Sequence, residues 1–340
     1  MKSMKLGLSL GYWGSTSPQH HVQMAQQAEK LGYDSVWTAE AYGSDALTPL
    51  AWIGAQTSRI RLGTGICQIS ARTPTAMAMA ALTMDHLSNG RMILGLGVSG
   101  PQVVEGWYGA PFSKPLARTR EYISIIRQVL AREEPVANDG EHYPLPFTGE
   151  GSWDLGKPLK PITHPLRADL PIMMGAEGPK NVALAAEIAD GWLPLYYSPF
   201  RQDVYSASLS NAKADFEVTQ GLVVNITDDV EQGLIPIKHM LALYVGGMGA
   251  KDRNFHKELV SRMGFEADAE KIQDLYLAGK KQEAAEAVPS ALADEISLVG
   301  PVEKIRDRLQ VWDETPVTSI NVSARSVVEL QTLADLMLDR

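Results

Sequence analysis

Apolar residues along the chain fall into two patterns, short compact runs and longer stretches with helical spacing. Compact runs bounded by turn residues are typical of parallel strands that are buried on both faces. The runs that predict strands are residues 4–10, 34–38, 60–66, 91–96, 171–174, 191–195, 221–226 and 317–322. Between these runs, apolar residues recur at i, i+3, i+4 and i+7, as at Met77, Ala80, Ala81 and Met84, which predicts helices.

This alternation of strands and helices predicts the fold. The first four strand–helix units contain no hairpin signal between them, which favours a parallel sheet with right-handed crossovers. We therefore predict one α/β domain over residues 1–340, a (β/α)8 TIM barrel with its active site at the carboxyl ends of the strands. Two insertions interrupt it: a Gly- and Pro-rich flap at about 135–161, with Asp139-Gly140 as a hairpin turn, and a mainly helical excursion at about 228–299.

Composition narrows the class of protein. With 45% hydrophobic and 21% charged residues, the 340-residue chain has the composition of a soluble globular protein. A formal charge of -9 and the lack of Lys and Arg clusters disfavour a nucleic-acid partner. No segment reaches the roughly 18 apolar residues of a membrane span, and the first residues do not resemble a secretory signal. We expect a cytoplasmic protein.

The cysteine content is also consistent with a cytoplasmic protein. Cys67 is the one cysteine in the sequence, so the chain has no intramolecular disulfide and no cysteine-based metal site. Its apolar surroundings in GICQIS favour a small buried hydrophobic residue over a reactive thiol.

The stretch PIMMGAEGPKNVALAAEIADGWLP, residues 171–194, predicts a strand, a glycine turn and the start of a helix. Gly175 and Gly178 allow the backbone to bend and to approach a ligand, and Pro179 suits the first helical position. Such a turn leaves backbone N–H groups free at the positive end of a helix dipole, which is typical of a phosphate site, and Lys180 could add a charge. The same pattern also fits a plain helix entrance, and the Gly-Lys-Ser/Thr ending of a Walker loop is missing.

The residues that follow the predicted strands are rich in glycine and aromatics and poor in histidine. No Ser-His-Asp or Cys-His arrangement can be drawn from them, so they suit a planar cofactor better than a nucleophilic triad. Glu40 directly follows the second strand, where it either serves function, pairs with an arginine or caps the next turn. The aromatic residues that either line a substrate pocket or only cover the barrel top are Tyr12, Trp13, Trp107, Tyr196 and Tyr197.

Three motifs occur in a set order: RIRLGTGI at 59–66, NGRMILGLGVSGPQ at 89–102 and GAEGPKNVALAAEIADGWLP at 175–194. Together, over nearly the whole chain, they resemble the bacterial luciferase-like superfamily, in its branch of F420-dependent oxidoreductases. The resemblance implies a TIM barrel with an insertion segment, usually dimeric, that binds coenzyme F420 or, in sister branches, FMN. It also implies a bulge at Gly65-Ile66 with a non-prolyl cis peptide behind the flavin ring.

By the same resemblance, the backbone of residues 175–180 holds the cofactor phosphate. The residues implied to bind the cofactor are Glu40, Gly65, Ile66, Val98, Ser99, Gly100, Gly175, Ala176, Glu177, Gly178, Pro179 and Lys180. The sugar-phosphate dehydrogenase branch has a histidine after the acidic residue of the second strand, where this chain has Ala41. We therefore expect the implied cofactor site in this chain, but not the sugar-phosphate substrate of that branch.

We thus expect an enzyme that transfers a hydride between F420 and a small organic substrate, with Glu40 at the ring edge as hydrogen-bond partner or proton relay. One alternative is an FMN-dependent luciferase-like monooxygenase that uses a reductase partner. A second alternative is a flavin-binding barrel without turnover. A homodimer is expected from the resemblance, and the substrate cannot be read from the sequence.

Overall fold

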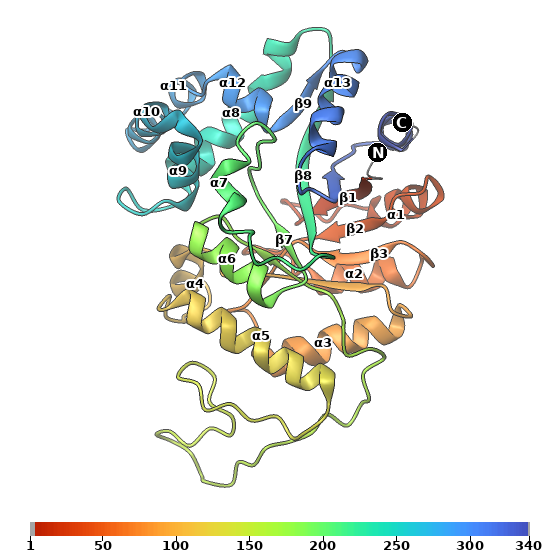
Figure 1. Cartoon of the computed structure of the whole chain (residues 1–340), viewed down its shortest axis with the longest axis vertical. Coiled ribbons are helices and arrows are strands. Elements are labelled where there is room, and N and C mark those ends of the chain that lie inside the picture. Colours follow the sequence, from red (N-terminus) through yellow and green to blue (C-terminus); the bar gives the residue numbers. More distant parts are fainter. Residues whose placement is uncertain (1–3, 339–340) are drawn as a thin grey trace.

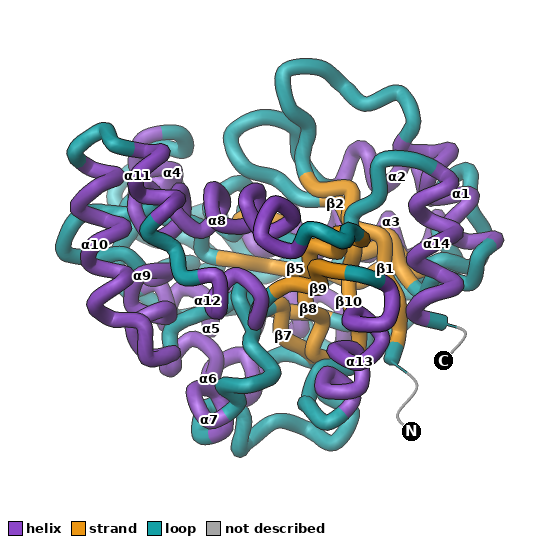
Figure 2. The backbone as a smooth tube through the Cα atoms, turned by 90° about the horizontal axis from the view of Figure 1, so that it is seen from above, coloured by secondary structure: helices purple, strands orange, loops and turns teal. Residues whose placement is uncertain are grey.

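The computed structural model describes residues 4–338, and its centre is a closed ring of parallel strands. The ring consists of β1 (Lys5–Gly11), β2 (Ser35–Thr38), β3 (Arg61–Thr64), β5 (Met92–Gly97), β6 (Ile172–Gly175), β7 (Gly191–Leu193), β8 (Glu217–Ile226) and β10 (Ser319–Val322). Each strand pairs with the next, and β10 pairs with both β8 and β1, which closes the ring (Figures 1 and 2). The predicted TIM barrel is confirmed.

Helices cover the outside of the ring. They are α1 (His21–Lys30), α2 (Leu47–Gly54), α3 (Pro74–Leu87), α5 (Pro115–Ala131), α6 (Pro179–Ile188), the short α7 (Asp203–Ser206), α13 (Val302–Asp313) and α14 (Val327–Met337). The start of α3 shows the local cause: Pro74 takes the first helical position and the Thr73 side chain accepts a hydrogen bond from the Ala76 N–H. Met77 and Ala81 of this helix are fully buried, so the periodic apolar positions form its core face.

The interior of the barrel is filled by side chains. Trp37, Ile93 and Met173 form a separate buried cluster with Leu193 packed against it. A Cβ on Gly63 would lie 2.4 Å from the Trp37 ring, so this position of β3 has room only for glycine. Small residues on one strand thus make space for large ones on the next, and the barrel is a packed core without a pore.

Charged side chains join the amino-terminal ends of the strands. Arg61 Nη2 lies 2.5 Å from Asp34 Oδ2, Arg61 Nη1 lies 3.1 Å from Glu217 Oε1, and Lys5 Nζ lies 2.9 Å from the same oxygen. Burial alone would lower the pKa of Arg61, but the hydrogen bonds to Glu217 and Asp34 outweigh it and raise that pKa. Every charge in this network of four has an opposite partner.

The predicted excursion is mainly helical and lies as a group beside the barrel (Figure 1, upper left). Its elements are α8 (Val230–Gly247), α9 (Phe255–Val260), the turn η1 (Ser261–Phe265), α10 (Glu266–Leu277), α11 (Lys281–Glu286) and α12 (Ser290–Glu295). The short strand β9 (Ser297–Gly300), at the end of the predicted excursion, has no counterpart among the predictions; it pairs with residues 223–226 of β8. The four buried residues of β9 are too short a run to stand out after a long helical stretch.

The flap follows α5 as an extended arm (Figure 1, bottom). Isolated antiparallel bridges join Val136 to Leu159 and Asn138 to Leu145. The predicted hairpin turn at Asp139-Gly140 lies in the loop between the bridged residues Asn138 and Leu145, which extends beyond these two residues. Glu121 Oε2 accepts hydrogen bonds from the backbone N–H groups of residues 142 and 143 and thereby holds the loop open.

Two short elements at the barrel mouth have no counterpart among the predictions. Strand β4 (Cys67–Gln68) resumes after the end of β3 and pairs with β5, and helix α4 (Pro101–Gly106) follows β5. Within residues 4–338, no helix combines the length and the apolar character needed to cross a bilayer.

Candidate functional site

The turn between β6 and α6 is built as the sequence predicts. Gly178 is extended (φ -69°, ψ 144°), Pro179 is the first helical residue, and the Asn181 N–H donates to the Gly178 carbonyl oxygen at 2.9 Å. In the described part of the chain, the backbone N–H groups of Glu177 and Gly178 donate to no protein group. Two free donors at the positive end of a ten-residue helix form a place for a phosphate or another oxyanion.

The helical excursion packs over this turn. Arg262 of η1 donates from Nη2 to the Glu177 carbonyl oxygen at 3.3 Å. His256 of α9 places Nδ1 2.7 Å from Glu177 Oε2, although the two atoms are not aligned for a hydrogen bond. Tyr196, which follows β7, packs edge-on against Tyr244 of α8 and His256, with ring centroids 5.8 Å and 6.1 Å apart. Residues from β6, β7 and the excursion therefore meet at one point.

Several buried polar atoms at this point have no hydrogen-bond partner among the described residues. They include Asn181 Oδ1, Tyr196 Oη and Arg262 Nε. Burial and, after it, the nearby Tyr244 and Glu177 raise the pKa of Tyr196 well above its usual value, so its hydroxyl is a neutral donor. Native proteins pair nearly all buried polar groups, so a cluster of unpaired ones marks a place for a ligand. Amides, a hydroxyl and a guanidinium fit the phosphate end of a flavin or deazaflavin.

The predicted bulge lies at the carboxyl end of β3. The Gly65-Ile66 peptide bond is cis, as the resemblance implies. The Gly65 N–H donates to the Thr38 carbonyl oxygen at 2.7 Å, which ties the bulge to β2. A Cβ on Gly97 would lie 2.9 Å from the Ile66 side chain, and one on Gly175 would lie 3.1 Å from it. The structure thus brings Gly65, Ile66 and Gly175 together at the mouth.

Glu40 follows β2, and its side chain is 3% exposed. Its Oε1 accepts hydrogen bonds from Arg72 Nη1 (2.9 Å) and the Gln68 N–H (2.8 Å). Its Oε2 accepts from Arg72 Nη1 (3.0 Å) and the Ala46 N–H (3.3 Å). A carboxylate has about four acceptor positions, and these contacts occupy them. Of the alternatives that the sequence left open, the pairing with an arginine is observed, and a part in proton transfer stays a prediction.

Cys67, next to the bulge, is fully buried. Burial, and secondly the charge of Glu40, raise the pKa of its thiol to about 12, so it is protonated at neutral pH. The interpretation as a small buried hydrophobic residue is confirmed.

The predicted aromatic residues divide into a buried and an exposed group. Tyr197 stacks on Tyr205 with ring centroids 5.1 Å apart and also contacts Trp192 and Trp312, so its ring lies in an aromatic core. The exposed members are Tyr12, Trp13 and Trp107. Whether any of the five contacts a substrate stays a prediction.

The end of β5 leads into α4 through Val98, Ser99 and Gly100. Ser99 has φ +60°, a left-handed conformation that is uncommon for a residue with a Cβ, and extended Gly100 precedes Pro101 of α4. Lys180 is exposed on the first turn of α6. These positions are compatible with the predicted cofactor site and do not test it.

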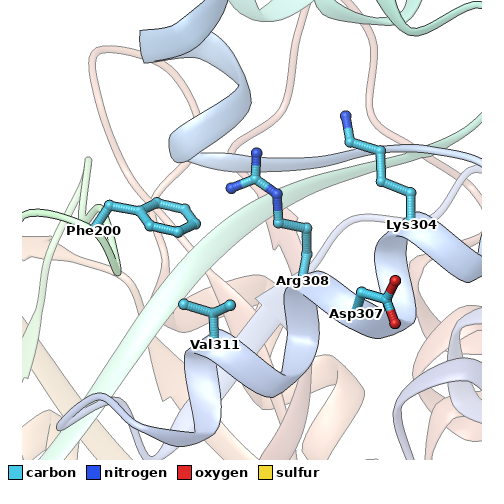
Figure 3. A pocket seen from close by; sticks show the side chains of 5 residues that line it. All are labelled: Phe200, Lys304, Asp307, Arg308 and Val311. Carbon is cyan, nitrogen blue, oxygen red and sulfur yellow. The ribbon is translucent and has the colours of Figure 1, made fainter.

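A shallow hollow of about 580 Å³ lies elsewhere, between Phe200 and α13 (Figure 3). Its cations already have partners: Lys304 Nζ lies 2.7 Å from Asp294 Oδ1, and Arg308 pairs with the same carboxylate and stacks over Phe200. None of the predicted site residues lines this hollow, so we place the candidate site at the barrel mouth.

Sequence reasoning missed Arg72, Tyr244, His256 and Arg262. Arg72 follows the third strand closely and could have been found as a cation near Glu40. The other three lie in the excursion, roughly 60 to 90 residues after the turn; Arg262 and His256 contact Glu177, and Tyr244 packs against His256. No local pattern marks them, since only the packing of the excursion on the barrel brings them to the turn.

Comparisons with known proteins show the family and the fold of the chain. The profile of the luciferase-like monooxygenase family matches residues 5–319. A Mycobacterium tuberculosis protein, whose name assigns it to the coenzyme F420-dependent oxidoreductases, is 56% identical over 343 residues, which cover 98% of this chain and 99% of that protein.

Two solved structures share the fold over 99% of both chains. The F420-dependent tetrahydromethanopterin reductase of Methanopyrus kandleri superposes with a TM-score of 0.79 at 21% identity. The oxygenating constituent of 3,6-diketocamphane monooxygenase from Pseudomonas putida, in complex with FMN, superposes with a TM-score of 0.67 at 16% identity. With a family match over most of its length, the chain belongs to the luciferase-like monooxygenase family.

Proposed function

We propose that this protein is an F420-dependent oxidoreductase that transfers a hydride between the deazaflavin and a small organic substrate. The observation that carries the proposal is the pair of free amides at Glu177 and Gly178, at the start of α6 and beside unpaired buried polar atoms. The relative at 56% identity, with its name from the F420-dependent class, favours F420 over FMN as the occupant.

The chain's own residues would hold the two ends of this cofactor. The backbone of residues 175–180 would take the phosphate, since its free N–H groups and the dipole of α6 favour an anion. Gly65, Ile66 and the 98–100 segment would line the ring. When bound, the deazaflavin supplies the hydride chemistry, and the protein supplies position and electrostatics.

Glu40 would act at the ring edge. Its carboxylate fixes the Gln68 N–H of β4 and pairs with Arg72, so it holds the strand that resumes after the Gly65-Ile66 bulge. Burial alone would lower the pKa of Arg72, but the hydrogen bonds to Glu40 outweigh it and raise that pKa, so the guanidinium stays charged. We propose that this charged pair orients groups at the ring and takes part in proton transfer.

Titration of the purified protein with F420 and, separately, with FMN tests the proposal. Seven tryptophans provide an intrinsic fluorescence signal. We expect saturable quenching by F420 at lower concentration than by FMN. Tight binding of FMN without binding of F420 would instead support an FMN-dependent monooxygenase, an alternative favoured by the family description and by the FMN complex of a structural relative.

A turnover screen tests the remaining alternative of a flavin-binding barrel without activity. Reduced F420 bound to the protein would be offered carbonyl, enone and imine compounds while its reoxidation is followed by absorbance. Reoxidation by one class identifies the substrate chemistry, and failure with every class would favour a binding role. The homodimer also stays a prediction, which light scattering on the purified protein checks.

A further inference from the structure

Among the described residues, Arg262 is the arginine with a buried guanidinium nitrogen that has no hydrogen-bond partner. Arg61 and Arg72 pair with carboxylates, and Arg91 donates to carbonyl oxygens and a hydroxyl through all three of its guanidinium nitrogens. Among residues 4–338, Arg262 forms no ion pair; it has the one bond to the Glu177 carbonyl oxygen, and its buried Nε has no partner. A buried donor without an acceptor is costly, so the unpaired Nε of Arg262 marks a place for a further ligand.

The local structure holds Arg262 in place over the turn. Met263, the next residue, is buried in the core with 1% of its surface exposed. Gly264 has φ +93°, which glycine adopts without strain, and this bends the chain inside η1. Phe265 packs under the guanidinium of Arg201 at 4.9 Å. With Met263 and Phe265 both anchored, the backbone at Arg262 is fixed and its side chain is directed by the bond to residue 177.

The groups around Arg262 include several hydrogen-bond donors that lack an acceptor. The free N–H groups of Glu177 and Gly178 and the Tyr196 hydroxyl are donors without acceptors, and Tyr196 is 2% exposed. The carboxylate of Glu177 would repel an anion, but its Oε2 lies against His256 Nδ1 of the excursion. A group with several acceptor oxygens and negative charge would satisfy all these donors, and the planar guanidinium suits the oxygens of a phosphate.

We propose that the helical excursion completes the anion site through Arg262, which binds the phosphate of the cofactor opposite the amides of the β6–α6 turn. Binding of the cofactor phosphate then depends on two segments far apart in sequence, the β6–α6 turn and η1. This inference rests on the proposed function only for the identity of the ring. The phosphate-binding role of Arg262 applies equally to a deazaflavin and to FMN.

Arg262→Gln removes the charge and leaves a shorter, neutral side chain that can still donate a hydrogen bond, and Arg262→Lys keeps the charge without the planar fork. Arg253→Gln is the matched control, because Arg253 is an exposed arginine of the same excursion. Dissociation constants would be measured by fluorescence for three deazaflavins: the chromophore with its ribityl chain, its 5′-phosphate and full F420. FMN and riboflavin form a second series, which differs by the phosphate alone.

We expect Arg262→Gln to weaken the 5′-phosphate and F420 about 10- to 100-fold, as the loss of a charge-assisted contact predicts, with the chromophore unchanged. Arg262→Lys should lie between this variant and the wild type, and Arg253→Gln should match the wild type. Each comparison is a ratio within one preparation, so a modest loss of stability does not affect it.

Three results with Arg262→Gln would overturn the inference. They are an unchanged affinity of Arg262→Gln for the 5′-phosphate, an equal loss for all three deazaflavins, and a loss confined to full F420, which would assign Arg262 to the glutamate carboxylates of its tail. If the wild type binds FMN and no deazaflavin, the proposed function fails. The role of Arg262 in phosphate binding is then tested by comparing FMN with riboflavin alone. The inference is also overturned if the wild type binds the 5′-phosphate no more tightly than the chromophore and FMN no more tightly than riboflavin.

Discussion

The two ends of the barrel use similar polar residues in opposite ways. At the amino-terminal end, Lys5, Asp34, Arg61 and Glu217 each have an opposite charge within 3.1 Å. At the carboxyl end, the groups around the β6–α6 turn include donors that no atom of residues 4–338 satisfies. The first end gains its stability within the chain, whereas the second keeps donors free for the ligand that we propose. This division agrees with the rule that TIM barrels bind substrates at the carboxyl ends of their strands.

The Glu40–Arg72 pair lies between these two cases. It is at the mouth, yet its charges are paired as fully as those of the opposite end. The comparison therefore predicts different responses to substitution: loss of stability at the amino-terminal end, loss of binding at the turn, and an effect on turnover at Glu40.

The largest effect is expected for Arg61→Met. The substitution leaves Asp34 without its cation and Glu217 with Lys5 alone, so we expect unfolding to become easier by about 3 kcal/mol. Urea denaturation followed by circular dichroism measures this change, and F420 affinity should stay the same. Arg59→Met is the control, since its exposed side chain makes one contact of 3.4 Å; a loss of similar size there would contradict the assigned role of the network.

Glu40→Gln should lower turnover by about 100-fold, with a much smaller change in F420 affinity, in the range typical for groups that act in proton transfer. The substitution keeps the shape of the side chain and removes the charge beside Arg72. Steady-state kinetics and fluorescence titration on the same preparation separate the two effects. Glu105→Gln, an exposed carboxylate on α4, serves as control. Full turnover with collapsed affinity would show that Glu40 has a structural role alone.

Tyr196→Phe and Tyr197→Phe form a matched pair, because both hydroxyls are buried and neither has a partner among residues 4–338. We expect Tyr196→Phe to weaken F420 binding several-fold, up to about 10-fold, because its ring packs against His256, which contacts Glu177 of the turn. Tyr197→Phe keeps the ring in its aromatic core and should change affinity little. Equal losses in both variants would remove the distinction between the two positions.

The smallest effect concerns acid stability. Burial alone would raise the pKa of Glu217, but hydrogen bonds from Arg61 and Lys5 outweigh it and lower that pKa. A carboxyl group with a lowered folded pKa contributes stability above its unfolded pKa of about 4.3 and loses it as pH falls through the folded value.

Glu217→Gln should therefore flatten the acid side of the stability curve below about pH 4, by roughly 1 kcal/mol. Denaturant melts at a series of pH values measure it. A variant as acid-sensitive as the wild type would show that other carboxylates determine this limb.

Local patterns in the sequence determined most of the scaffold. Compact apolar runs and helical spacing predicted all eight barrel strands and the longer helices that cover them, because burial on two faces or one face leaves a period in the sequence; the short helices α4 and α7 were missed. The turn at residues 175–180 was found in the same way, since Gly178 and Pro179 have conformations that depend mainly on their own backbone. The resemblance correctly implied the cis peptide at Gly65-Ile66.

Tertiary structure alone decided which side chains meet. Arg72 satisfies Glu40, and Arg262, His256 and Tyr244 reach the turn only because the excursion folds over the strand ends. The same holds for the four-residue strand β9, which pairs with the part of β8 that extends beyond the barrel. Contacts between distant segments depend on packing that no local period encodes, and so the sequence predicted the turn that we propose as an anion site, while the fold decided which residues of the excursion lie over it.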